Sequence, residues 1–239
     1  MQDSLWMNTI GRVAFLNCDP LFYGLDKKWE VLAAPPAWLT GHLLRKDCIL
    51  APIPAADYAR HSDELILLPD IGICSRGEVG SVLVFGTMPL ESMKSIALPT
   101  DSATSVQLLK YLLGKRHLAP HLELMGPDLG SMLAKCDGAL LIGDRALEEA
   151  KKNPASVQLD LGTDWLQFTQ KPMVFGVFAA RKDTPIEPLR VAQGILTENL
   201  RMFEQNSEQR EKVIQWALTR SDLDYERLDR YFGEVFNRI

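Results

Sequence analysis

The sequence lacks the features that mark membrane, nucleic-acid-binding and repeat proteins. No segment among its 239 residues reaches the ~18 consecutive apolar residues of a membrane span. Its net charge is −5, without long runs of one sign. Because phosphate binding relies on clustered Lys and Arg, no nucleic-acid partner is expected. Internal repeats and low-complexity segments are absent as well. We therefore expect a globular protein that binds neither membranes nor nucleic acids.

Cysteine is scarce, and its spacing argues against metal or redox chemistry. The four cysteines are far apart and form no C-x-x-C pair. Small buried thiols in a reducing compartment explain them better than metal ligands. Residues 1–10 contain neither the basic stretch nor the sustained apolar stretch of a secretion signal. The expectation is a cytoplasmic protein with no metal site.

Short apolar runs alternate with helix-like stretches from Gly11 onward, a pattern typical of parallel βαβ units. A first set of strands is predicted at residues 12–16, 30–34, 48–53, 65–68 and 81–85, with a helix at 38–45. A second set has strands at 95–98, 121–125, 139–142 and 157–161, and helices at 102–113, 129–134 and 145–152. A loop around Trp165 precedes an apolar strand at 173–180, and the pattern after Arg181 is helical.

This order predicts an α/β, two-lobed, periplasmic-binding-protein-like (type II) fold with a hinged cleft between the lobes. Residues 1–86 and 181–239 would form lobe one with the C-terminal helices, and residues 87–180 would form lobe two. Two crossovers of the chain would let the lobes close on a ligand. A single doubly wound domain with a helical tail is the alternative.

Two segments place polar residues or glycine where a buried strand ends, namely 100–105 (TDSATS) and 138–144 (GALLIGD). Small anions bind at such places in α/β sheets, because helix N-termini offer unpaired N–H groups and partial positive charge. Hydroxyl groups at the start of the first helix could bind a carboxylate or could cap the helix, and both roles can coexist. The candidates for binding a carboxylate are Ser102, Thr104 and Ser105, and the candidates for capping are Asp101, Ser102 and Thr104.

Three further residues are candidates at strand ends. Gly143 permits close approach of the backbone, and Asp144 could accept a proton or cap the following helix. Asn17 could donate to an oxyanion and accept from a hydroxyl, although Asn at a strand end is more often a turn residue. The four histidines fall outside these segments, so no catalytic histidine is nominated.

Five motifs occur in order along the chain, and together they resemble the menaquinone-biosynthesis family of chorismate dehydratases, which belong to the futalosine pathway. The motifs are Leu16-Asn17-x-x-Pro20-Leu21, Gly72-Ile73-x-x-x-Gly77-x-Val79-x-Ser81-Val82, Ser102-x-Thr104-Ser105, Leu141-Ile142-Gly143-Asp144-x-Ala146-Leu147 and Asp160-Leu161-Gly162-x-x-Trp165. The resemblance covers about residues 12–181.

The resemblance implies a two-lobed, cofactor-free enzyme that removes water from chorismate to give 3-[(1-carboxyvinyl)oxy]benzoate. It also implies a catalytic role for Asn17 in orienting the reacting atoms. Ser81, at the start of a crossover strand, could bind the second carboxylate or could be an ordinary strand-end hydroxyl. The other candidates for substrate binding are Ser102, Thr104, Ser105, Gly143 and Asp144. The sister family of 1,4-dihydroxy-6-naphthoate synthases carries a catalytic His where this chain has Gly143, which favours the dehydratase.

The chain departs from the family pattern in two places. Pro36-Ala37 replaces Pro-Ser, and the loop at 169–172 (TQKP) replaces Thr-Gly-x-Pro. Both departures leave substrate preference open. Two alternatives therefore stand beside the dehydratase: a non-catalytic binding or sensing module of the same fold, since fold alone does not settle function, and an enzyme acting on another carboxylated ring.

Overall fold

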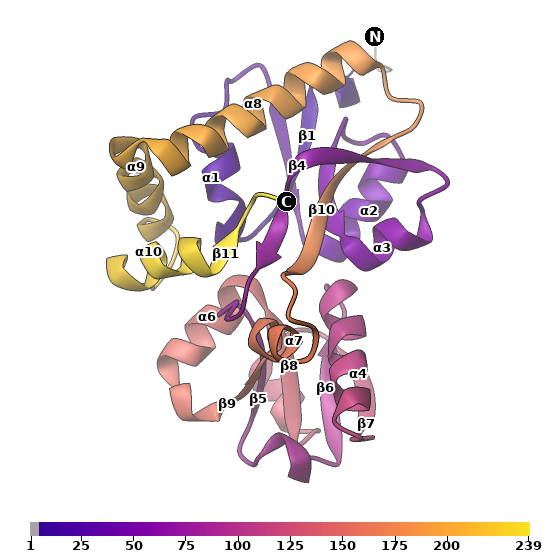
Figure 1. The fold of residues 1–239 in the computed structure, drawn as a ribbon, viewed down its shortest axis with the longest axis vertical. Helices are drawn as coiled ribbons and strands as arrows, with labels where there is room; N and C mark the ends of the chain where they lie inside the picture. The colour runs from indigo at the N-terminus through magenta and orange to yellow at the C-terminus, as the bar shows by residue number, and fades with distance from the viewer. Residues whose placement is uncertain (1–4) are drawn as a thin grey trace.

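The computed structural model describes residues 5–239 and shows two α/β lobes joined by two extended connections (Figure 1). The upper lobe in Figure 1 contains the first and the last elements of the chain, and the middle of the chain forms the lower lobe. The predicted two-lobed α/β architecture is confirmed.

The first lobe is built on strands in the order β2-β1-β3-β10-β4-β11, because an isolated bridge between Ile10 and Leu50 connects the β1-β2 pair to the rest. These strands are β1 (Thr9–Val13), β2 (Glu30–Ala34), β3 (Ala51–Pro54), β4 (Leu65–Ser75), β10 (Met173–Arg181) and β11 (Val235–Phe236). The strand predicted at 12–16 starts and ends earlier, because Leu16 already belongs to a short 3-10 helix.

The second lobe is a five-stranded sheet in the order β7-β6-β8-β5-β9. Its strands are β5 (Val82–Gly86), β6 (Ser95–Pro99), β7 (His121–Met125), β8 (Gly138–Ile142) and β9 (Val157–Asp160). The prediction that residues 81–85 complete the first sheet was wrong, because β5 pairs with β8 and β9. Local pattern identifies a strand but carries no information on its partners.

Each sheet contains one strand inserted antiparallel between two parallel neighbours, and the edge strand β11 of the first lobe is also antiparallel to β4. In the first lobe this strand is β10, between β3 and β4, and in the second lobe it is β5, between β8 and β9. The inserted strand is the one through which the chain enters that lobe. The carboxyl ends of the parallel strands and the starts of the inserted strands therefore face the junction of the lobes, where α/β sheets bind ligands.

Helices cover both sheets. In the first lobe these are α1 (Asp19–Phe22), α2 (Pro36–Leu44), α3 (Ala55–Arg60), α8 (Ile186–Gln205), α9 (Ser207–Leu218) and α10 (Tyr225–Glu234). In the second lobe they are α4 (Thr104–Lys115), α5 (Leu129–Leu133), α6 (Gly143–Lys152) and α7 (Leu161–Thr169). Short 3-10 turns lie at Leu5–Asn8, Leu16–Cys18, Leu90–Ser92 and Pro154–Ser156. Figure 1 shows α8 lying across the first lobe, with α9 and α10 folded back beneath it.

The segment around Trp165, predicted as a loop, is the helix α7. The carboxylate of Asp160 caps it by accepting from the Thr163 N–H at 2.8 Å, and it also accepts from the Val79 and Gly80 N–H groups. A Cβ on Gly162 would lie 2.3 Å from the Gly77 carbonyl oxygen, so only glycine fits there. The Asp160-Leu161-Gly162 motif thus fastens the connection between β4 and β5 to the second lobe.

Among the described residues, no helix is long and apolar enough to cross a bilayer. The four cysteine thiols are free and buried.

Candidate active site

A cavity of about 60 Å³ lies at the junction of the two lobes. Six of the seven predicted site residues line it, and they come from strand ends and helix starts of both lobes. The lining consists of Val13, Phe15, Asn17, Pro36, Pro52, Ile53, Pro54, Ile73, Val79, Ser81, Val82, Ser102, Thr104, Ser105, Ile142, Gly143, Phe175, Gly176 and Val235. The predicted residue that does not line the cavity is Asp144.

None of these lining residues carries a titratable side chain. The four histidines lie elsewhere, as expected, and the described part of the chain holds no cluster of three or more side chains that could bind a metal ion. Polar character in the cavity therefore comes from one amide, four hydroxyls and the backbone.

Asn17 reaches the cavity from the 3-10 turn that follows β1. Its side chain is 8% exposed, and its Oδ1 is buried without a hydrogen-bond partner among residues 5–239. Because an unpaired buried amide oxygen costs stability, such an atom in a cavity points to a ligand that donates to it.

The second-lobe wall is the start of α4. The helix begins at Thr104, and Ala103 is its N-cap without a side-chain bond, so the alternative that Asp101, Ser102 or Thr104 caps it is wrong. Instead, Thr104 Oγ1 accepts from the Ala56 N–H of the first lobe at 3.1 Å. The first N–H groups of a helix have no acceptor inside it. This end of α4 thus offers donors and partial positive charge to the cavity.

Ser81 immediately precedes β5, and hydrogen bonds hold both its backbone and its side chain. Its carbonyl oxygen accepts from the Gly143 N–H at 2.8 Å, and its Oγ accepts from the hydroxyl of Tyr231 at 3.2 Å. Ser81 is 3% exposed and Tyr231 is fully buried. No sequence pattern indicated a role for Tyr231 at the site, because a tyrosine on the apolar face of a C-terminal helix has the pattern of a core residue.

Gly143 is required by the contact between the lobes. Its φ is +65°, and a Cβ there would lie 2.6 Å from the ring of Phe15, which also lines the cavity. The prediction that glycine permits a close approach at this position is confirmed, and the group that approaches is an aromatic ring of the other lobe.

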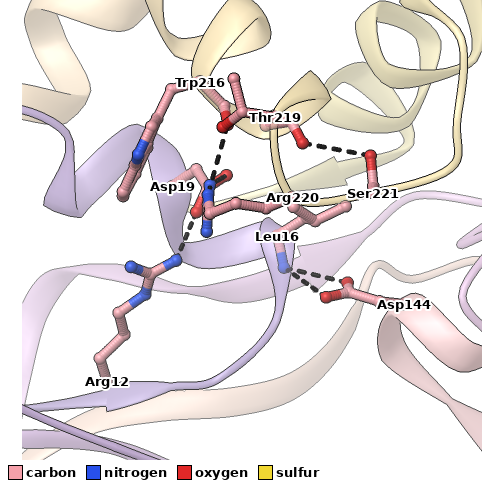
Figure 2. Close-up of polar contacts among 9 residues, drawn as sticks. Arg12, Leu16, Asp19, Asp144, Trp216, Thr219, Arg220 and Ser221 are labelled. Carbon is pink, nitrogen blue, oxygen red and sulfur yellow. Dashed lines mark hydrogen bonds and ion pairs between the residues drawn. The ribbon is translucent and has the colours of Figure 1, made fainter.

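Asp144 lies behind the cavity wall, where it connects the lobes. Its carboxylate oxygens accept from the Leu16 N–H at 3.0 and 3.2 Å (Figure 2). It does not cap α6, which begins one residue earlier with Ile142 as its N-cap. Burial raises the pKa of the Asp144 carboxyl from 3.8 to about 7.

A buried cluster of charged side chains lies next to the 3-10 turn Leu16–Cys18, on the side that faces α9. Asp19 is fully buried and accepts from the guanidinium groups of both Arg12 and Arg220 (Figure 2). Arg220 in turn lies 3.8 Å above the ring of Trp216. Sequence reasoning missed this cluster, because Asp19 and Arg220 are 201 residues apart and no local pattern connects them.

The sequence of this chain is similar to those of known proteins. A family model described as menaquinone biosynthesis matches residues 8–237. The chorismate dehydratase of Thermus thermophilus is 36% identical over 192 residues, which covers 74% of this chain and 70% of that protein. The chorismate dehydratase of Campylobacter jejuni is 29% identical over 174 residues, covering 73% of this chain and 64% of that protein.

Among solved structures, a protein of Archaeoglobus fulgidus superimposes with a TM-score of 0.71 at 20% identity, covering 93% of this chain and 85% of that one. The alkanesulfonate-binding protein SsuA of Xanthomonas axonopodis superimposes with a TM-score of 0.68 at 12% identity, covering 95% and 85%. A Candida albicans protein described as having the generic periplasmic binding protein fold gives 0.68 at 12%, covering 96% and 81%. The predicted periplasmic-binding-protein-like fold is thereby confirmed.

Proposed function

Because this chain belongs to the menaquinone-biosynthesis family, we propose that it is a chorismate dehydratase, a carbon–oxygen lyase that converts chorismate to 3-[(1-carboxyvinyl)oxy]benzoate and water. The observation that carries the proposal is the Asn17 amide oxygen, which is buried at the interlobe cavity without a hydrogen-bond partner among the described residues.

Dehydration of chorismate requires few catalytic groups from the protein. Chorismate is a dianion with an ether at C3 and a hydroxyl at C4. When the C3 proton leaves, its electron pair forms the C3–C4 double bond, the C4–O bond breaks, and the departing hydroxide takes a proton to become water. The ring becomes aromatic, so the product is strongly favoured. The protein must bind the carboxylates, orient the hydroxyl and stabilise charge that spreads to the ring carboxylate.

The cavity offers suitable groups for each task. In the proposed arrangement, the N-terminal end of α4 and the hydroxyls of Ser102, Thr104 and Ser105 bind one carboxylate. Ser81 binds the second carboxylate, and the backbone at Gly143 lies close to the ring. Asn17 accepts from the C4 hydroxyl through Oδ1 and orients it for departure. In this arrangement Asp144 does not touch the substrate. It accepts from the Leu16 N–H and so holds the turn that carries the neighbouring Asn17.

The base in this proposal comes from the substrate. No lining side chain can accept a proton at neutral pH. A carboxylate of chorismate itself is the remaining candidate for removing the C3 proton. No metal or cofactor is part of the proposal.

Substrate entry requires the lobes to separate. The cavity of about 60 Å³ is smaller than the ~300 Å³ at which ligand pockets usually begin. Hydrogen bonds that join the lobes around it include Ala37 N–H to the Asp101 carbonyl at 3.2 Å, Ala56 N–H to Thr104 Oγ1, and Leu16 N–H to Asp144. We infer that these bonds break on opening and re-form over the bound substrate. The strand pairings favour lobe boundaries between β4 and β5 and between α7 and β10, each one strand before the boundary predicted at residues 86 and 181.

A cytoplasmic location is part of the proposal. The four free, buried thiols support it, because a reducing compartment keeps such thiols unpaired.

Mixing the purified protein with chorismate tests the proposal. Loss of the diene absorbance, with a product lighter than chorismate by one water in mass analysis, is the expected result. Tight binding of chorismate without any loss would contradict it in favour of a non-catalytic binding module. Turnover of a different member of a panel of shikimate-pathway acids, with chorismate untouched, would point to another carboxylated ring.

A further inference from the structure

We propose that Tyr231 is a positioning residue that acts through Ser81: its hydroxyl donates to Ser81 Oγ and thereby directs the hydrogen of Ser81 into the cavity, toward a carboxylate of the substrate. This inference rests on the proposed function, because it assigns the donor that would bind one of the two carboxylates. It adds a residue of the C-terminal helix α10 to a site otherwise built from strand ends and helix starts.

The geometry fixes Ser81 at two of its groups. The Gly143 N–H donates to the Ser81 carbonyl oxygen at 2.8 Å, which holds the backbone. The Tyr231 hydroxyl donates to Ser81 Oγ at 3.2 Å, which holds the side chain. A serine hydroxyl has one hydrogen and two lone pairs. When Tyr231 supplies a hydrogen to one lone pair, the hydrogen of Ser81 is left for another acceptor.

No acceptor for that hydrogen exists within residues 5–239. The only side-chain partner of Ser81 Oγ in the described structure is Tyr231, and Ser81 lines the cavity. An anion in the cavity would therefore complete a chain of donors that runs from tyrosine to serine to carboxylate. Successive hydrogen bonds of this kind polarise one another, which makes the last donor stronger.

Tyr231 is suited to remain a donor. It is fully buried, and burial raises the pKa of its hydroxyl, so it stays protonated throughout the physiological range. Its ring packs beside that of Phe232, with the centroids 5.9 Å apart, which fixes the direction of the hydroxyl. A ring that only filled space could be phenylalanine here. The buried hydroxyl aimed at a cavity serine is the feature that packing alone does not explain.

A double-mutant cycle tests the inference. Wild type, Tyr231→Phe, Ser81→Ala and the double variant are compared by kcat/KM for chorismate dehydration and by calorimetric Kd for chorismate. Tyr231→Phe should lower kcat/KM about tenfold, because the Ser81 hydroxyl is no longer directed at the charged carboxylate and that hydrogen bond is lost or weakened. In the Ser81→Ala background the same change should alter kcat/KM by less than about twofold, since the group through which Tyr231 acts is gone.

The control is Tyr225→Phe on the same helix, which removes a hydroxyl that donates at 2.6 Å to the exposed Glu211. It should leave kcat/KM unchanged. Equal losses from Tyr231→Phe in both backgrounds would overturn the inference, since that is the behaviour of a residue that only packs. An unaffected Ser81→Ala variant would overturn it as well.

The cycle separates this inference from the proposed function. If wild type consumes chorismate but the cycle is additive, only the role of Tyr231 fails. If wild type binds chorismate without consuming it, the dehydratase proposal fails, and the cycle in Kd still decides whether Tyr231 acts through Ser81. If wild type neither binds nor consumes chorismate, both proposals fall together.

Discussion

The carboxylate of Asp144 in the second lobe accepts a hydrogen bond from the backbone N–H of Leu16 in the first lobe, with both oxygens within 3.2 Å of the nitrogen (Figure 2). Leu16 immediately precedes Asn17 in the same 3-10 turn. The contact therefore links closure of the lobes to the placement of the amide that we assign to the reacting hydroxyl.

The same contact should make stability depend on pH. The pKa of Asp144 rises from 3.8 to about 7 on folding because of burial, so between these pH values the folded state binds the extra proton. The free energy of unfolding therefore falls as pH rises from about 4 to about 7 through this group. Asp144→Asn removes the titration while keeping an acceptor oxygen. We expect the variant to gain stability relative to wild type across this window, measured by urea denaturation at a series of pH values.

Other groups near Asp144 bear on this measurement. Asp19 and Glu148 raise its pKa, and Arg220 lowers it. Burial also raises the pKa of Asp19 to about 6, but this titration is present in both proteins. Asp137→Asn is the control, because the backbone N–H of Lys94 lowers the pKa of the half-buried Asp137. Its stability curve should run parallel to that of wild type between pH 5 and about 7. A parallel curve for Asp144→Asn would contradict the prediction.

Gly143→Ala should destabilise the protein and impair the site. At φ +65° a Cβ costs about 1–2 kcal/mol, and here it would also overlap the Phe15 ring at 2.6 Å. We expect the free energy of unfolding to fall by at least ~2 kcal/mol in urea denaturation. Gly194→Ala, in α8 with no atom within 4 Å of the added Cβ, should instead raise it by about 0.5–1 kcal/mol. A Gly143→Ala variant as stable as wild type would show that the lobes do not meet at this point.

The sequence predicted where the strands of this fold lie better than it predicted which strands pair with each other. The strands at 30–34 and 121–125 were placed to the residue, because apolar periodicity and flanking turn residues are local signals. The helices α1 and α3 were missed, since four to six residues span too little of a 3.6-residue period to register. The helical pattern predicted after Arg181 corresponds to three helices, of which the last runs from Tyr225, capped by Asp224, to Glu234. The assignment of β5 to the wrong sheet shows that pairing depends on long-range contacts.

For the site, the sequence motifs predicted which residues meet at the cavity better than they predicted what each side chain does there. Six predicted residues meet at one cavity, because each sits at a strand end or helix start that the fold directs to the junction of the lobes. The roles of Thr104 and Asp144 were harder to foresee. Thr104 bonds to Ala56 and Asp144 to Leu16, each across the interface between lobes, and no local pattern encodes such a contact.

Asp19→Ala should be strongly destabilising. Asp19 is fully buried between Arg12 and Arg220, so its removal leaves two guanidinium groups close together without a counter-charge. Loss of one partner from a buried ionic group usually costs about 3–5 kcal/mol. Urea denaturation should show a loss of that size. Glu198→Ala, which breaks an exposed pair with Arg201, should have no measurable effect. Similar losses in the two variants would mean that the Asp19 cluster is not a structural centre.

Asn17→Ala should separate function from stability. The side-chain Oδ1 has no protein partner, so its removal costs the fold no hydrogen bond at that atom and relieves a buried unsatisfied group. Turnover of chorismate should nevertheless fall at least about tenfold, because the reacting hydroxyl loses the group that orients it. Asn237→Ala provides the comparison: Asn237 is also buried, but its amide donates to the Gly72 carbonyl at 3.2 Å. That variant should lose stability and keep its turnover per folded molecule. If Asn17→Ala instead unfolds more readily and turns over chorismate at the wild-type rate, Asn17 is a structural residue and the cavity must bind its ligand in another way.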